Sequence, residues 1–295
     1  MNHRDLLNGK IFLTVISLSF IYAFLFIQHG HAQTPKGTLK LAIIPHRSTL
    51  GNEQAYGMLI EALEKETGIT FQWTGSKTYD EVIKKIGTKQ ADIGYVGAFG
   101  YVEAQENFGV KLIARTYGKK KRESYYSMII TREDAGLNTL QDLKGKSFIF
   151  NDPKSTSGFL FPMLELKKAE IKIEDFSEVR YVTRHANSLL AVYNKQADAG
   201  AISSTAKEKV DIDFSKIKIL WKSEPIYRGP WIVNKDLSDE QFNLIQSALL
   251  RISNYKDAEM IFKDLGTKGF IKGFDSDYDN IREVRKLMPE LSQPK

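Results

Sequence analysis

Three hydroxyl residues stand side by side in the segment Asp152-Pro153-Lys154-Ser155-Thr156-Ser157-Gly158. A strand-like apolar run (147–150) precedes this segment and a helix-like run (159–168) follows it, so the hydroxyls stand where a helix would begin. Hydroxyl donors, free backbone N–H groups and the helix dipole together suit a tetrahedral oxyanion. The alternative is that Ser155 or Ser157 only caps the helix. The segment alone leaves both interpretations open.

The composition excludes several other kinds of chemistry. The 295 residues include no cysteine, which excludes disulfides, thiolate metal sites and cysteine nucleophiles. The sequence also lacks His-Glu-x-x-His, Gly-x-Ser-x-Gly, a phosphate loop ending in Gly-Lys-Ser/Thr and any cluster of metal-ligating carboxylates and histidines. We therefore expect a protein that is not an enzyme and that needs no metal or organic cofactor.

The charge of the chain indicates the sign of its ligand. The formal net charge of +6 fits an anionic ligand or surface. The one basic cluster, Lys119-Lys120-Lys121-Arg122, has the composition of a solvated loop. We therefore expect no nucleic acid among the partners.

Residues 1–32 have the organisation of an export signal. Arg4 and Lys10 precede an uncharged apolar run (11–27), and Gly30-His31-Ala32 supplies the small residues of a cleavage site. This order predicts export to the periplasm and a mature chain that begins at or near Gln33. The apolar run is also close to the shortest length that spans a bilayer, so an uncleaved membrane anchor is the alternative.

The rest of the sequence alternates between strand-like and helix-like patterns. Predicted strands are 38–45, 69–73, 92–96, 110–116, 126–131, 147–150, 179–183 and 199–202. Predicted helices are 52–66, 158–168, 188–195, 238–253, 256–265 and 278–288, and a capping box, Thr78-x-x-Glu81, begins a further one. Such alternation is typical of α/β proteins with mainly parallel sheets.

A short internal repeat suggests two lobes of similar build. Lys89-Gln90-Ala91-Asp92-Ile93-Gly94 recurs as Lys195-Gln196-Ala197-Asp198-Ala199-Gly200, and each copy is predicted to end a helix and begin a strand. Ligands of open α/β sheets bind beyond strand ends, where loops enter helices, and Ser155–Ser157 would have that position in the second lobe. The alternative is that such turns simply favour these residue types.

Several of these segments resemble, in the same order, the periplasmic substrate-binding proteins of phosphate/phosphite/phosphonate ABC transporters. The Asp-Pro-x-Ser-Thr-Ser-Gly string is quite specific to that family, and the resemblance extends over about residues 37–237. The other matching segments are Ile44-Pro45, Tyr79-Asp80, Asp92-Ile93-Gly94-Tyr95-Val96-Gly97 with Tyr101, Tyr125-Tyr126-Ser127, Leu140-x-x-Leu143-Lys144-Gly145-Lys146 and His185.

The resemblance implies a type II periplasmic-binding-protein fold, in which two α/β lobes joined by two crossover strands enclose a ligand cleft. Lobe 1 would comprise residues 37–125 and return at 229–295, and lobe 2 would comprise residues 126–228. The crossovers would lie near 126–133 and 219–231.

By position, the resemblance implies six ligand-binding residues, two of them aromatic, three hydroxyl-bearing and one imidazole. They are Tyr79, Tyr125, Ser155, Thr156, Ser157 and His185. The tyrosines would contact a phosphonate, the hydroxyls would bind phosphoryl oxygens, and the histidine would donate from the second lobe. Simpler alternatives are that Tyr79 packs in the core, that Tyr126 faces the ligand in place of Tyr125, and that His185 is an ordinary surface residue.

The sequence departs from family members that bind aminoalkylphosphonates. Those members carry carboxylates for the ammonium group, whereas this chain has Ser203-Ser204-Thr205-Ala206 and Gly229 at the corresponding places. Because an unpaired ammonium is costly to bury, we expect a plain anion such as phosphate, phosphite or a simple phosphonate. If the alignment in these loops is shifted by one or two residues, the nearby Glu208 or Glu224 would take the role of those carboxylates. The arginines that could neutralise a dianion are Arg47, Arg184 and Arg228.

These expectations describe a monomeric solute-binding protein that captures a small oxyanion and docks on an ABC permease. The alternative from another functional class is a membrane-anchored sensor that reports ligand occupancy to a signalling partner. The fold is common to both and does not decide between them.

Overall fold

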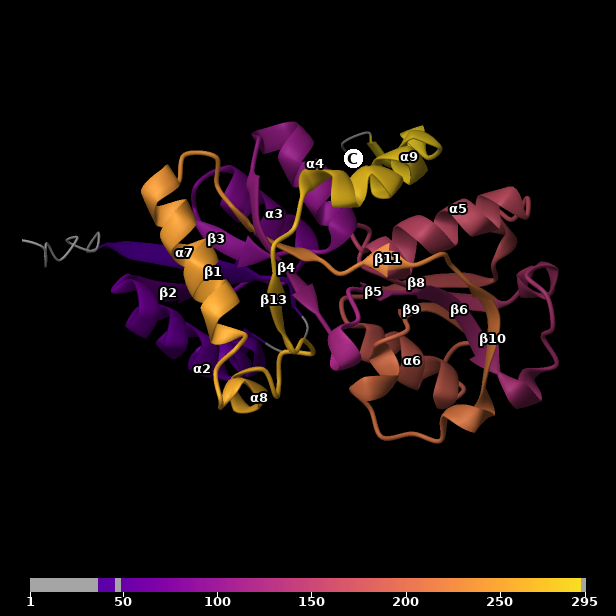
Figure 1. Cartoon of the computed structure of the whole chain (residues 1–295). Helices are drawn as coiled ribbons and strands as arrows, with labels where there is room; N and C mark the ends of the chain where they lie inside the picture. The colour runs from indigo at the N-terminus through magenta and orange to yellow at the C-terminus, as the bar shows by residue number, and fades with distance from the viewer. Residues whose placement is uncertain (1–36, 46–48, 293–295) are drawn as a thin grey trace, which may run out of the picture. The chain divides into compact units, whose positions relative to one another are not determined.

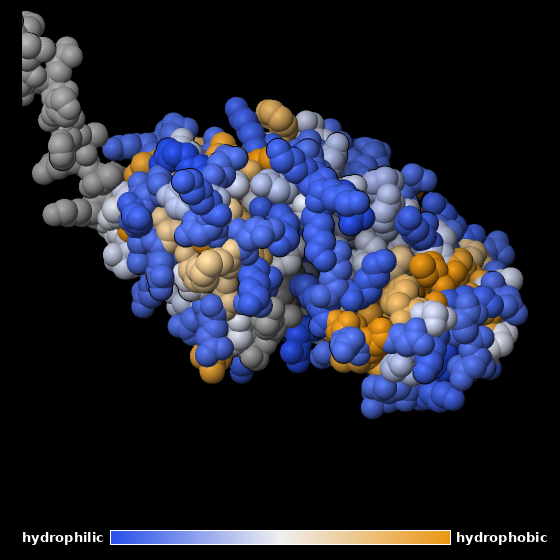
Figure 2. Space-filling view, turned by 60° about the horizontal axis from the view of Figure 1, so that its bottom comes forward, coloured by the Kyte–Doolittle hydropathy of each residue, from blue (hydrophilic) through white to orange (hydrophobic). Residues whose placement is uncertain are grey.

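The computed structural model describes residues 37–45 and 49–292. The predicted export segment and Arg47 lie outside these residues. Two β-sheets, each flanked by helices, give the described chain two α/β lobes (Figure 1). Hydrophilic residues cover most of the face shown in Figure 2, because the large apolar side chains are mainly buried in four cores. Within the described residues, no helix has the length and apolar character needed to cross a membrane.

The first lobe contains a six-stranded sheet in the order β13-β4-β12-β3-β1-β2. Its strands are β1 (Thr38–Ile43), β2 (Thr70–Thr74), β3 (Ile93–Tyr95), β4 (Lys111–Tyr117), β12 (Pro230–Val233) and β13 (Gly269–Ile271). Helices α2 (Thr49–Thr67), α7 (Asp239–Ile252) and α8 (Ala258–Ile261) bury their apolar residues on one face of the sheet. Helices α3 (Tyr79–Gly87), α4 (Ala98–Phe108) and α9 (Asp279–Lys286) share the core on the other face.

The second lobe contains a five-stranded sheet in the order β10-β6-β9-β7-β8. Its strands are β6 (Ser127–Arg132), β7 (Ser147–Asn151), β8 (Glu178–Val182), β9 (Ala199–Ser203) and β10 (Ile217–Lys222). Residues of α5 (Phe161–Lys168) pack with one core of this lobe, and residues of α6 (His185–Tyr193) pack with the other. Each lobe is therefore a three-layer arrangement of helix, sheet and helix.

The chain passes between the sheets through a short two-stranded pair. Strands β5 (Ser124–Tyr125) and β11 (Ile226–Tyr227) pair antiparallel, and in the chain each lies between a strand of one sheet and a strand of the other (Figure 1). The predicted crossovers at 126–133 and 219–231 largely coincide with β6 and with β10 to β12. The buried residues of β6 pair on both sides within the second sheet, and so the crossing occurs just before that strand.

The sheets are mixed, and the prediction of mainly parallel sheets was wrong. Parallel pairing occurs between β1 and its neighbours β2 and β3, and between β7 and its neighbours β8 and β9. Strands β4, β6, β10, β12 and β13 pair antiparallel, and β12 enters the first sheet from the second lobe. Helix α4 was also not predicted, because its residues 98–104 are all buried and so show no amphipathic period.

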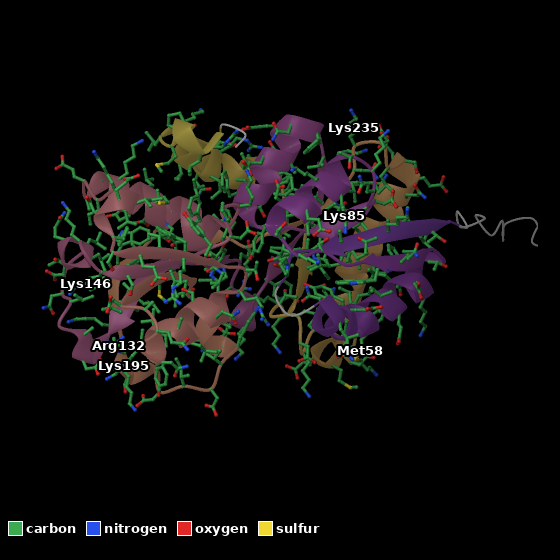
Figure 3. All side chains as sticks on the ribbon, turned by 180° about the vertical axis from the view of Figure 1, so that it is seen from behind. Met58, Lys85, Arg132, Lys146, Lys195 and Lys235 are labelled. Carbon is green, nitrogen blue, oxygen red and sulfur yellow. The ribbon has the colours of Figure 1, made fainter. Side chains whose placement is uncertain are left out.

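The repeated hexapeptide has the same structural role in both lobes. Lys89 and Lys195 have left-handed backbones, with φ of 61° and 60°, at the ends of α3 and α6. The Asp92 carboxylate accepts from the Lys40 N–H at 2.8 Å, and the Asp198 carboxylate accepts from the Ser147 N–H at 2.9 Å. Each copy therefore connects a helix end to a neighbouring parallel strand, β1 in the first sheet and β7 in the second. Figure 3 labels Lys195 beside Arg132, and both of these cations pair with Asp134.

Candidate functional site

A cavity of about 80 Å³ is lined by residues of both lobes and of the crossing segments. All six residues predicted for the site line it: Tyr79, Tyr125, Ser155, Thr156, Ser157 and His185. A cavity needs a volume of roughly 10–15 Å³ for each water molecule that it holds, so this cavity has room for a group of only a few heavy atoms. Its size matches a tetrahedral anion with a small substituent.

The hydroxyl segment enters the cavity at the start of a π-helical turn, Thr156–Leu160. Ser155 is the N-cap, and its Oγ accepts from the Gly158 N–H at 3.1 Å. The capping role is therefore real, yet the same residue also lines the cavity. A Cβ at Gly158 would lie 2.3 Å from Cβ of Asn151, so the turn requires glycine. π-Helical turns of this kind occur often at functional sites.

Thr156 is oriented by the first lobe. Its Oγ1 accepts from the Phe99 N–H, in the first turn of α4, at 2.9 Å. Because a backbone donor already uses an acceptor site on this hydroxyl, its own O–H remains to donate. The carbonyl of Ser157 accepts from Ser127 Oγ at 2.7 Å, which fixes the backbone of the turn and leaves the Ser157 side chain at the cavity.

Three tyrosines line the cavity, and each is kept in its neutral, donating form. Burial raises the pKa of Tyr79 well above its usual value, and Asp152 adds to the effect. Burial raises the pKa of Tyr95 to about 12. Burial also raises the pKa of Tyr125, while its hydrogen bonds with Ser157 and Thr156 act in the opposite direction.

Two alternatives for the tyrosines were that Tyr79 packs in the core and that Tyr126 faces the ligand in place of Tyr125. Tyr79 is both packed and at the cavity, since it belongs to the core around α3 and lines the pocket. Tyr125 lines this cavity, whereas the ring of Tyr126 lies under Lys222 Nζ at 3.7 Å and borders a neighbouring cavity.

His185 is the first residue of α6 and is neutral. Its Nδ1 accepts from the Ser203 N–H at 3.0 Å, so the ring proton is on Nε2. Burial, followed by the charge of Lys209, lowers the pKa of His185 to about 3. Helix α6 has no side-chain cap and no acidic residue in its first turn. The imidazole Nε2–H and the helix terminus are therefore both suited to an anion.

The charged residues of the cavity are all basic. Arg184, Lys209 and Arg228 line it, and the described part of the lining includes no Asp or Glu. Arg228 Nη1 donates to the Gly266 carbonyl at 3.1 Å. Within the described residues, the Arg184 side chain has no hydrogen bond or ion pair, and it is half-buried. The described lining therefore combines neutral donors with three basic side chains.

Several lining residues were not among the predicted six. The principal ones are Tyr95, Gly97, Thr183, Ala186, Ser203, Thr205 and Lys209. Most follow or end a strand: β3 ends at Tyr95, β8 at Val182 and β9 at Ser203. The rule that ligands bind beyond strand ends could have found them, but it gives no means of choosing among the residues of a loop.

Comparison with known proteins shows consistent similarity to one family. Residues 41–278 match the family of the periplasmic substrate-binding protein of the phosphonate ABC transporter. The chain is 28% identical, over 84% of each sequence, to the phosphate-import protein PhnD of Mycolicibacterium smegmatis. It is 24% identical to the phosphonates-binding periplasmic protein of Escherichia coli, over 94% of this chain and 85% of that protein.

Solved structures show the same fold. A binding-protein component of an ABC phosphonate transporter from Pseudomonas aeruginosa has a TM-score of 0.78 at 22% identity, over 87% of this chain and 88% of that one. PhnD1 from Prochlorococcus marinus, solved with methylphosphonate, has a TM-score of 0.75 at 22% identity, over 85% of this chain and 98% of that one.

Proposed function

We propose, since this chain belongs to the family of periplasmic substrate-binding proteins of phosphonate ABC transporters, that it captures a small phosphoryl-type oxyanion for an ABC importer. Phosphate, phosphite and simple phosphonates are the proposed ligands. The chain would act in the periplasm as a monomer and deliver its ligand to the permease. We propose lobe boundaries at 37–125, 126–228 and 229–295, which place the six-stranded sheet in one lobe and the five-stranded sheet in the other.

One observation carries this proposal: the cavity combines neutral donors with basic side chains, and its described lining has no carboxylate. A dianion that leaves water must recover its hydrogen bonds and find positive charge. We assign Ser155, Thr156 and Ser157 to phosphoryl oxygens from one side. The phenols of Tyr79 and Tyr125 and the Nε2–H of His185 donate from the others.

The same cavity favours a plain anion over one with an ammonium group. A Cβ at Gly229 would lie 2.2 Å from the Val96 carbonyl oxygen, so no carboxylate can stand there without a shift of the backbone. The hydroxyls of Ser203 and Thr205 are hydrogen-bonded to each other at 2.8 Å. Glu208 borders a neighbouring cavity, and Glu224 is exposed.

Calorimetry on ligand-free protein tests the proposal directly. The chain is unfolded in denaturant, dialysed and refolded so that any co-purified ligand is removed, and it is then titrated with phosphate, phosphite and methylphosphonate. We expect saturable one-to-one binding of at least one of them, with added chelator making no difference. Absence of heat and of any rise in melting temperature with all three anions would refute the proposed ligand class.

A further inference from the structure

A second, larger cavity of about 680 Å³ adjoins the ligand cavity. The two share five lining residues: Arg184, Ala186, Thr205, Lys209 and Arg228. The larger cavity also takes residues from 118–119, 208–211 and 263–268, and we refer to it as the vestibule. A substituent on a phosphoryl group bound in the inner cavity has this space to enter.

The vestibule has an excess of positive charge. In the described part of its lining, six residues are basic and three are acidic. Lys119 pairs with Glu208 at 3.9 Å. Arg184, Lys263 and Lys268 form no ion pair or side-chain hydrogen bond with other described residues. A cleft that is lined mainly by basic residues attracts anions and repels cations.

We propose that the vestibule binds a second anionic group of the ligand. The favoured ligands would be phosphonates or phosphate monoesters whose organic group ends in a carboxylate or a phosphate. This inference rests on the proposed function, because it takes the inner cavity to hold the phosphoryl group.

Arg184 is the residue assigned to the second anion. It lines both cavities, is half-buried and has no partner among the described residues. A guanidinium presents a planar fork of donors that matches a carboxylate or phosphate in two hydrogen bonds. Arg228 stands at the same junction, but Nη1 is already used by the Gly266 carbonyl. A ligand with a short chain would therefore meet Arg184 as it leaves the inner cavity.

The test compares two phosphonates of equal chain length, 3-phosphonopropionate and propylphosphonate, by calorimetry at low ionic strength. We expect the wild-type protein to bind the carboxylated compound about five-fold or more tightly, since a partly buried charge-assisted hydrogen bond has that order of effect. Arg184→Gln should bring the two affinities to within about two-fold. Arg251→Gln, on α7 and paired with Glu66, removes the same charge outside both cavities and should leave the wild-type ratio intact.

Methylphosphonate separates failure of this inference from failure of the proposed function. If methylphosphonate and the other simple anions do not bind, the proposed function fails. If methylphosphonate binds but the wild-type protein does not prefer the carboxylated compound, the vestibule assignment is wrong. A preference that persists unchanged in Arg184→Gln would also overturn it. Propylphosphonate binding by that variant shows that the inner site is still folded.

Discussion

Helices α3 and α6 hold equivalent places in the two lobes, and they differ at the end that faces the ligand cavity. Each has nine residues, each precedes one copy of the repeated hexapeptide, and each begins with a residue of the cavity, Tyr79 or His185. At α3, Thr78 Oγ1 caps the helix, and the Tyr79 N–H donates to Asp152 Oδ2 at 3.1 Å. At α6, neither a cap nor an acidic residue is present.

This difference indicates that the two lobes have different roles in binding the anion. The first turn of α3 contains Asp80 and Glu81, and its terminus holds the Asp152 segment of the opposite lobe. At the start of α6, His185 and Ala186 line the cavity, and the imidazole there is neutral. The first lobe therefore orients the hydroxyl segment, while the second lobe supplies most of the donors for the anion. The predictions below test this asymmetry.

Ala186→Asp gives α6 the acidic first turn that α3 already has, because Ala186 corresponds to Asp80 in the repeat alignment. A carboxylate about 4 Å from a bound anion is unfavourable by roughly 4 kcal/mol at an effective dielectric constant of 20, so affinity for methylphosphonate should fall by about 100-fold or more. The helix itself should be slightly stabilised, by about 0.5 kcal/mol. Calorimetry and urea unfolding measure the two effects.

The neutral variant Ala186→Asn is the matched control, since it has nearly the same size without the charge. It should retain affinity within about ten-fold of the wild type. If Asp and Asn lower affinity equally, the loss comes from bulk, and the α6 terminus does not face the anion.

Thr156→Ala removes the hydroxyl that the first lobe orients through the Phe99 amide. The anion loses one charge-assisted hydrogen bond, and the Phe99 N–H loses its acceptor. Affinity for methylphosphonate should fall by about ten-fold or more. Thr156→Ser keeps the hydroxyl and should bind nearly as well as the wild type. Calorimetry that finds the alanine variant unchanged would remove Thr156 from the proposed site.

The third prediction concerns the charge of the ligand itself. Methylphosphonate should bind about five-fold or more tightly than 2-aminoethylphosphonate, because the described lining of the ligand cavity has no carboxylate and the vestibule next to it has more basic than acidic residues. Competition titration at one pH gives the ratio without separate fits. Tighter binding of the amino compound would mean that an acid outside this lining reaches the ligand.

The sequence was most predictive where chemistry and local pattern coincide. The Ser155–Ser157 segment has both a strand-to-helix position and donor side chains, and the structure brings it to the cavity with Tyr79, Tyr125 and His185. Helix α4 was missed because burial on all sides removes the periodic signal, yet its Phe99 amide orients Thr156. The vestibule could not be predicted, since it gathers residues such as Arg184 and Lys268 through tertiary contacts alone.

His185→Asn tests whether the histidine of the second lobe is held neutral. The folded state keeps the pKa of this imidazole near 3, whereas the unfolded chain takes up the proton near pH 6.5. Protons therefore bind preferentially to the unfolded state as the pH falls from 6.5 toward 3, and the wild type loses stability in that window. Asn accepts from the Ser203 N–H as well but does not titrate.

The stability difference between His185→Asn and the wild type should therefore change in favour of the variant by about 2 kcal/mol from pH 7 to pH 5. Urea midpoints across this range provide the measurement. A difference that stays constant with pH would show that the imidazole is protonated as readily in the folded protein as in the unfolded chain.

The last prediction concerns a feature that the two lobes share, the left-handed lysine after the helix, and its expected effect on stability is the smallest. Lys89 and Lys195 both adopt left-handed backbones, which cost a residue other than glycine about 1 kcal/mol. Each also pairs with a partly exposed aspartate, Asp236 or Asp134, and such pairs contribute little. Lys89→Gly and Lys195→Gly should therefore each stabilise the protein by about 0.5 kcal/mol after the extra entropy of glycine in the unfolded chain is counted. If urea unfolding finds one variant more stable than the wild type and the other less stable, the two hexapeptides do not affect stability in the same way, although they share a sequence pattern and a backbone shape.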